Sequence, residues 1–189
     1  GCSVNCLYCP QSALSSASRG IKERVLTYEN FKKYLSNVPH YVDIHWTGYS
    51  EPCLARDLDR MIKHTHEKGH KQLISTTLDG VLSSAKYVSE FAFFKSFTLH
   101  LPDKHGLMRG IENKKGYIER VLDLFPEIYK KNIQGLNLLT FGSEFHPKLE
   151  ELIKEYKKKG IDLKVDRRDH LHQRAGQVDK VKIENLEKK

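Results

Sequence analysis

The segment GCSVNCLYCP, residues 1–10, carries Cys2, Cys6 and Cys9 at the spacing C-x-x-x-C-x-x-C. Thiolate is the usual protein ligand of iron–sulfur clusters, and three thiolates on one short loop can reach three corners of one small cluster if the loop wraps round it. A four-iron cluster held in this way keeps one iron without a protein ligand. A reacting cofactor needs such an open position, just as catalytic zinc sites keep one open.

The same spacing leaves a zinc knuckle and a disulfide framework as structural alternatives. A zinc site needs a fourth ligand, and the sequence contains no second Cys-x-x-Cys pair. Disulfides are disfavoured because the fourth cysteine, Cys53, stands alone and Cys makes up only 4 of 189 residues. We assign Cys53 to packing or to the surface, outside the metal-binding set.

The charge balance of 32 Lys and Arg against 24 Asp and Glu gives a net charge of +8. This would suit an anionic partner, but the basic residues are spread along the chain and form no block interleaved with aromatic residues, so a nucleic-acid partner is not favoured. A non-enzymatic zinc- or iron–sulfur-binding module that contacts nucleic acid stays open as the alternative function. No apolar run predicts a membrane span or a membrane partner, and metal-binding thiols favour the reducing cytoplasm.

Apolar periodicity predicts strands and helices in alternation after the cysteine segment. Strands are expected at 41–46, 71–77, 94–101, 135–141 and 161–167, and helices near 28–38, 56–68, 81–91, 115–131 and 147–159. The Ser-rich segment 11–19 is typical of a loop. Thr27 is expected to cap the helix at 28–38, whose apolar stripe is Phe31, Tyr34, Leu35 and Val38. Strict alternation of strand and helix favours a parallel sheet in one α/β domain of ordinary size.

Within these strands, apolar and polar side chains alternate. Phe97, Leu99 and Leu101 are expected on one face, opposite Thr98 and His100. In a flat parallel sheet covered by helices on both faces, each strand would instead be a continuous run of apolar residues. A curved, incompletely closed barrel with outer helices and a polar interior fits this pattern, and a sheet with one face in solvent is the alternative.

With Tyr8 directly before its third cysteine, the segment resembles the radical S-adenosylmethionine (SAM) superfamily. The resemblance implies that Tyr8 is a cofactor-binding residue. The resemblance implies a partial (β/α)6 TIM-like barrel in which Cys2, Cys6 and Cys9 hold a 4Fe-4S cluster. It also implies that SAM binds the open iron and is cleaved reductively to a 5′-deoxyadenosyl radical, which abstracts hydrogen from a peptide, sugar or small polar substrate. A low-potential electron donor such as flavodoxin or ferredoxin is the implied partner.

The segment TGYSEP, residues 47–52, resembles the family's Gly-Gly-Glu segment, which holds the amino group of SAM. The resemblance implies that Gly48, Tyr49, Ser50 and Glu51 bind the cofactor. Tyr49 and Ser50 stand where glycines are common, so this sequence departs from the pattern. A plain turn with Glu51 at a helix start is the alternative, because a carboxylate is also favoured there.

Weaker resemblances follow the next two strands. The sequence TTLDG at 76–80 stands where the family often shows Thr-Asn-Gly, which implies that Thr76 and Thr77 line the ligand. Similarly, His100 stands where a polar contact to SAM is expected, and Arg109 resembles an arginine that binds the SAM carboxylate. For both residues an ordinary solvated or hydrogen-bonded side chain is the alternative.

The resemblance also predicts the domain organisation. Residues 1–172 are expected to form the core barrel, truncated before its first strand, since in the family the cysteine loop follows strand one. A missing strand would leave the strand at 41–46 with an unpaired edge. The sequence QRAGQV at 173–178 resembles a Ser-Arg-Ala-Gly stretch of the SPASM/twitch-type branch, so 173–189 is expected to be a charged junction to a C-terminal extension with auxiliary clusters.

Overall fold

The computed structural model describes residues 2–18, 25–80, 88–112, 114–132 and 135–168. In these ranges five strands form one sheet in the order of the sequence, and every neighbouring pair is parallel. The strands are β1 (Ile44–Trp46), β2 (Gln72–Thr76), β3 (Phe94–His100), β4 (Leu136–Phe141) and β5 (Lys164–Arg168). The predicted α/β class with parallel strands is therefore confirmed.

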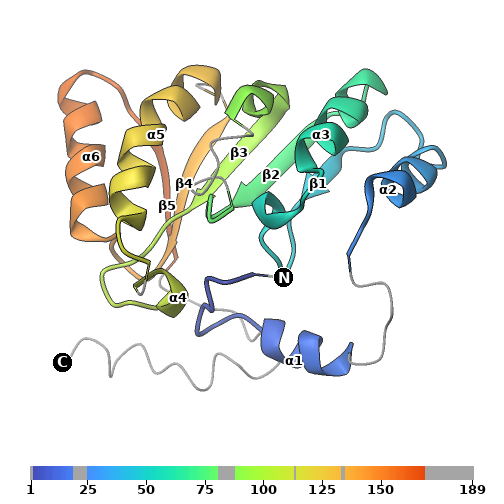
Figure 1. The fold of residues 1–189 in the computed structure, drawn as a ribbon. Helices are drawn as coiled ribbons and strands as arrows, with labels where there is room; N and C mark the ends of the chain where they lie inside the picture. The colour runs from blue at the N-terminus through green and yellow to red at the C-terminus, as the bar shows by residue number, and fades with distance from the viewer. Residues whose placement is uncertain (1, 19–24, 81–87, 113, 133–134, 169–189) are drawn as a thin grey trace.

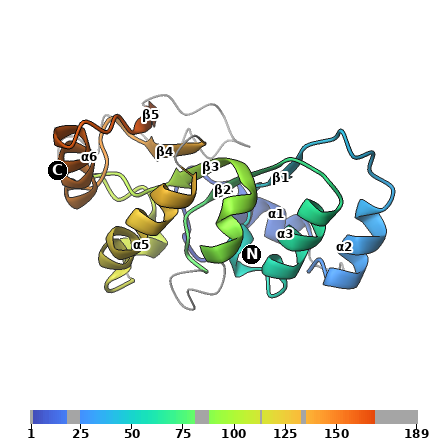
Figure 2. The ribbon, with the colours of Figure 1, turned by 90° about the horizontal axis from the view of Figure 1, so that it is seen from above.

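The helices alternate with the strands along the chain (Figure 1). They are α1 (Gln11–Ala17), α2 (Tyr28–Leu35), α3 (Leu58–Glu67), α4 (Arg109–Glu112), α5 (Tyr117–Asn132) and α6 (Pro147–Lys158), together with the 3-10 helices η1 (Pro52–Leu54) and η3 (Val88–Phe93). Figure 2 shows α3 and α5 on one side of the sheet, with α2 and α6 near its two ends. Parallel strands with outer helices on one side make this a partial TIM-like barrel.

Two elements differ from the sequence-based prediction. Residues 11–17 form α1 instead of a loop, because Pro10 fixes a near-helical φ of −78° and the Gln, Ala and Leu residues outweigh the serines. The helix expected at 81–91 falls partly on 81–87, outside the described residues. Beyond it the chain forms the 3-10 helix η3 rather than an α-helix.

The predicted start of α2 is confirmed, because the Thr27 hydroxyl accepts a hydrogen bond of 3.2 Å from the Asn30 backbone N–H. Phe31 and Leu35 are buried as predicted, but Tyr34 is 56% exposed. Tyr34 lies at the margin of the apolar stripe, and no other part of the described chain packs over its side chain there. The apolar stripe of α2 is therefore narrower than its sequence suggests.

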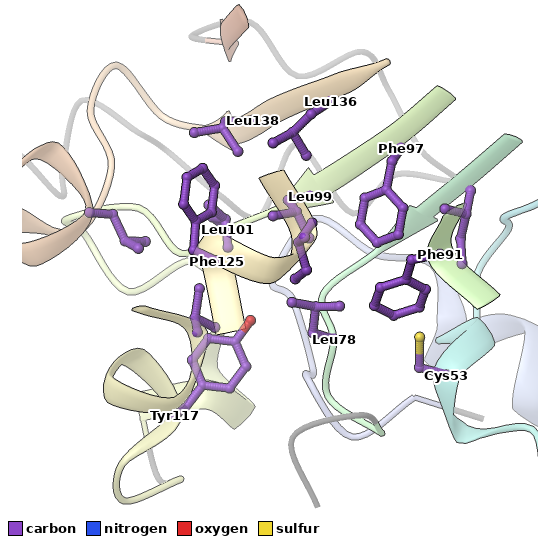
Figure 3. Close-up of a cluster of buried hydrophobic side chains, with 14 of the residues drawn as sticks. Cys53, Leu78, Phe91, Phe97, Leu99, Leu101, Tyr117, Phe125, Leu136 and Leu138 are labelled. Carbon is purple, nitrogen blue, oxygen red and sulfur yellow. The ribbon is translucent and has the colours of Figure 1, made fainter. Parts of the chain in front are cut away.

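The alternation along β3 is also confirmed. Phe97, Leu99 and Leu101 are each fully buried, whereas the intervening Thr98 and His100 are partly exposed. The apolar face packs on the helical layer, where the ring of Phe97 lies 4.8 Å from that of Phe91 (Figure 3). A fully buried Leu or Phe side chain contributes about 1.5–3 kcal/mol, so this face holds the sheet to its helices.

Parallel pairing brings the carboxyl ends of the strands to one edge of the sheet. The cysteine loop lies at this edge, next to the ends of β2 and β3 (Figure 1). At one side of the sheet, β1 pairs only with β2 within the described residues. None of the described helices is long and apolar enough to cross a membrane. The predicted junction at 173–189 lies outside the described residues, and the predicted truncation before β1 stays a prediction.

Candidate functional site

The cysteine loop is anchored to the chain around α4. Val4 is fully buried in the main core, and the Leu7 N–H donates a 2.9 Å hydrogen bond to the Leu107 carbonyl. Gly110 donates a 2.6 Å backbone bond to the Val4 carbonyl. A Cβ at Gly110 would lie 2.1 Å from the Ser3 carbonyl oxygen, so this close approach of two backbones requires glycine.

A polar cluster also ties the loop to the end of β2. The Ser3 hydroxyl donates to one carboxylate oxygen of Asp79, and the Lys114 ammonium forms an ion pair with the other. Lys114 also donates a 2.7 Å hydrogen bond to the Ser3 hydroxyl. Because Asp79 is only 8% exposed, its charge is shielded from water and depends on these partners.

Replacing Asp79 by Asn is expected to destabilise the fold by about 1–3 kcal/mol, because the ion pair is lost and the hydrogen bonds are weakened. Urea unfolding of the protein without cofactors measures this change. The control is Glu144→Gln, which breaks the exposed ion pair with Lys104 and should leave the unfolding midpoint unchanged. Equal midpoints for Asp79→Asn and the unchanged protein would contradict the anchoring role.

The turn after β2 has an unusual backbone. Leu78 adopts a φ of +61° while its side chain is fully buried. The buried Tyr117 hydroxyl donates a 2.5 Å hydrogen bond to the Thr77 carbonyl, and burial raises the pKa of this tyrosine well above its usual value. A Cβ at Gly80 would lie 1.9 Å from the Cys53 carbonyl oxygen. Packing therefore holds this turn in a conformation that leucine rarely adopts.

One pocket of about 90 Å³ brings together the cysteine loop and the segments that follow β1, β2 and β3. It is lined by Cys2, Cys6, Tyr8, Cys9, Thr47, Gly48, Tyr49, Ser50, Glu51, Ser75, Thr76, Thr77 and His100. All predicted site residues except Arg109 are among them. Thr47 and Ser75 also line the pocket and were not predicted to do so, although Thr47 begins the segment 47–52 that resembles the family pattern.

Glu51 is buried, and its carboxylate is surrounded by donors from its own chain. One oxygen accepts from the Cys53 N–H at 3.0 Å and from the Thr76 hydroxyl. The other accepts from the N–H and the hydroxyl of Thr77, at 2.8 and 2.7 Å. Glu51 is also the N-cap of η1, as in the helix-start alternative. These bonds join the β1 and β2 loops, and a contact with SAM stays a prediction.

The three cysteines of the loop are free thiols and partly exposed. Burial raises the pKa of Cys6 to about 12 and also raises that of Cys2. At neutral pH these two groups therefore carry protons when no metal is bound. A metal must displace these protons when it binds, which makes the affinity depend on pH. Cys53 is also free, but it is buried in the main core, which selects packing over the surface position that the sequence left open.

Among the residues that the structure describes, no group of three His, Cys, Asp or Glu side chains could hold a single metal ion. His66 and His70 have a spacing that some zinc sites use, but His66 stacks on Phe93 and His70 bonds the Val42 carbonyl. The cysteine loop fits a cluster better, because each cysteine binds a different iron of a 4Fe-4S cluster and the sulfurs need not converge on one point.

Two further residues near the pocket are informative. Arg109 is exposed at the start of α4 and does not line the pocket, so its contact with SAM stays a prediction. Sequence reasoning missed the role of Asp103, whose carboxylate accepts from the backbone N–H groups of His105 and Leu107 at 2.6 and 3.0 Å. Burial raises the pKa of Asp103. An aspartate side chain often accepts a hydrogen bond from the backbone N–H two residues further along the chain. The aspartate at position 103, directly after a strand and a proline, was therefore the sequence signal for this turn.

No family model matches the chain, and no curated protein matches it. A solved structure of TYW1, a radical SAM enzyme, with a lysine-pyruvate adduct bound, has a similar fold. The match covers 99% of this chain and 70% of that one, with a TM-score of 0.50 and 17% sequence identity. At this identity the likeness shows the fold alone, and it agrees with the partial barrel described above.

Proposed function

We propose that the chain is the core of a radical SAM enzyme, which binds a 4Fe-4S cluster and SAM and starts hydrogen abstraction from a peptide, sugar or small polar substrate. The observation that supports this most strongly is the pocket of about 90 Å³ described above. In it, three thiols from one loop face the loops after three parallel strands. Catalytic residues of βα barrels gather at this end of the strands. The fold of TYW1 adds independent support.

In this proposal Cys2, Cys6 and Cys9 hold three irons, and the fourth iron is left for SAM. When bound, the two cofactors supply the reductive cleavage that starts the radical reaction. The protein fixes the loop through Ser3. A polar group at the pocket wall, the Ser50 side chain, is available to orient SAM.

The remaining expectations belong to the same proposal. The electron would come from a low-potential donor such as flavodoxin or ferredoxin, in the cytoplasm. We also propose that the barrel continues, beyond a junction at 173–189, into an extension with auxiliary clusters. Reading the coding sequence past Lys189 would test that extension.

Anaerobic reconstitution with iron and sulfide tests the cofactor directly. We expect a brown protein with about four irons per chain that bleaches with dithionite and then forms 5′-deoxyadenosine from SAM. The matched control is the chain with Cys2, Cys6 and Cys9 replaced by Ala, which should stay colourless. A colourless protein that binds one zinc through these cysteines would contradict the proposal and favour a metal-binding module.

A further inference from the structure

The end of β5 carries a charged pair on the inner face of the sheet, which is the face turned away from the main core. Successive side chains of a strand point to opposite faces, so Lys164, Asp166 and Arg168 share one face and Val165 lies on the other. Val165 packs against the main core, which places the three charged side chains on the inner face. Two cations against one carboxylate leave a net positive charge there.

Phe141 of β4 connects this charged pair to the candidate site. The guanidinium carbon of Arg168 lies 5.9 Å from the ring centre of Phe141. The same ring lies 4.5 Å from that of Tyr8 and 4.9 Å from that of His100, and both of these side chains line the pocket. Because β5 runs beside β4 (Figure 1), the charged pair lies next to the pocket.

The guanidinium of Arg168 is held on one edge and open on the other. Its Nε and Nη2 groups donate to the same carboxylate oxygen of Asp166, at 2.9 and 2.8 Å. A guanidinium has five N–H donors, and within the described residues the remaining ones have no partner. The edge formed by Nη1 and Nη2 can therefore bind a second oxyanion through two parallel hydrogen bonds. The side chain is 49% exposed, so a ligand can reach it.

Uncharged polar side chains continue the inner face across the sheet. Ser75, which lines the pocket, stands opposite Thr98 on β3, and Thr98 stands opposite Asn137 on β4. The side-chain oxygen of Asn137 is buried and has no hydrogen-bond partner in the part of the chain that the structure describes. Buried oxygens usually have a donor, and a bound molecule with O–H or N–H groups would supply one. The inner face therefore suits a polar ligand.

We propose that Arg168 binds a carboxylate or phosphate group of the substrate, on the inner face beside the pocket. The inference rests on the proposed function and narrows it, because it selects anionic molecules among the peptides, sugars and small polar compounds that the proposed function allows. The net positive charge at this end of β5 attracts such a group. The open edge of the guanidinium fixes its orientation.

The test is isothermal titration calorimetry of the full chain without iron, with glycerate, glycerol 3-phosphate and neutral glycerol as probes. We expect an anionic probe to bind and glycerol not to bind, and the tighter anion identifies carboxylate or phosphate as the natural group. Arg168→Gln should weaken this binding about tenfold, as expected for the loss of a charge-assisted hydrogen bond. Arg168→Lys should also weaken it, because an ammonium keeps the charge but cannot form two parallel bonds.

The matched control is Arg167→Gln, which removes the same charge from the other face of the same strand. Arg167 pairs with Glu150 at 2.8 Å and lies 5.3 Å from the ring centre of Phe145, so the variant should bind the probe as the unchanged protein does. An equal loss in both variants would overturn the inference, and so would an anion that binds no better than glycerol. If Arg168→Gln does not fold, equal affinities for Arg168→Lys and the unchanged protein overturn it.

A second titration separates the substrate from SAM, which also carries a carboxylate. In the reconstituted protein saturated with SAM, the anionic probe should bind with unchanged affinity. Loss of probe binding on addition of SAM would assign Arg168 to the cofactor and overturn the inference. Failure of the chain to bind a cluster would instead overturn the proposed function, while the titration without iron still decides whether Arg168 binds an anion.

Discussion

Replacement of Cys2, Cys6 or Cys9 by Ala, one at a time, is expected to abolish assembly of the cluster, so that iron falls from about four per chain to near zero. The physical reason is that one of the four irons already has no protein ligand. Only three cysteines line the pocket within the described residues, and each is needed for a different iron. Losing one leaves two irons without protein ligands. Iron and sulfide analysis after anaerobic reconstitution measures the effect.

The matched control is Cys53→Ala. Cys53 is a free thiol like the other three, but its side chain lies in the main core and bonds the Thr76 hydroxyl at 3.2 Å. This variant should keep its iron and lose only the packing of one small side chain and its hydrogen bond with Thr76, about 1–2 kcal/mol of stability. A loss of iron as large as in the loop variants would show that the three-cysteine assignment is wrong.

Glu51→Gln is expected to destabilise the protein by about 3 kcal/mol even without cofactors. The buried carboxylate accepts hydrogen bonds from Cys53, Thr76 and Thr77. A glutamine keeps one accepting oxygen and replaces the other with an NH2 group, which faces donors and cannot accept. At least one buried donor then loses its partner. Since the stability of a domain is about 5–15 kcal/mol, this is a large fraction of it.

Urea unfolding of Glu51→Gln without iron or SAM separates this effect from any loss of ligand binding. Glu119→Gln is the control, because its ion pair with Lys148 is exposed and should contribute nothing measurable. If Glu51→Gln unfolds at the same urea concentration as the unchanged protein but binds SAM more weakly, Glu51 acts on the ligand. That result would support the SAM-binding role that the resemblance of segment 47–52 implies for Glu51. It would contradict the structural role inferred from the hydrogen bonds.

Several features of the protein could be predicted from the sequence because they depend on neighbouring residues. The spacing of Cys2, Cys6 and Cys9 predicted one loop with three thiols, and the structure brings them to one pocket. Alternation along β3 predicted which side chains are buried, since successive side chains of a strand point to opposite faces. Thr27 marked the start of α2 for a similar reason, because a cap acts within one turn.

The pairing of polar groups around the pocket could not be predicted in this way. The hydrogen bonds of Glu51 reach Thr77, 26 positions away, and the Ser3 hydroxyl reaches Asp79, 76 positions away. Which groups meet depends on the register of β1 against β2, where Trp46 stands opposite Ile74, and on the paths of the connecting loops. Local periodicity sets the face on which a side chain lies. Its partner across the sheet is set by packing of the whole domain, which only the tertiary structure decides.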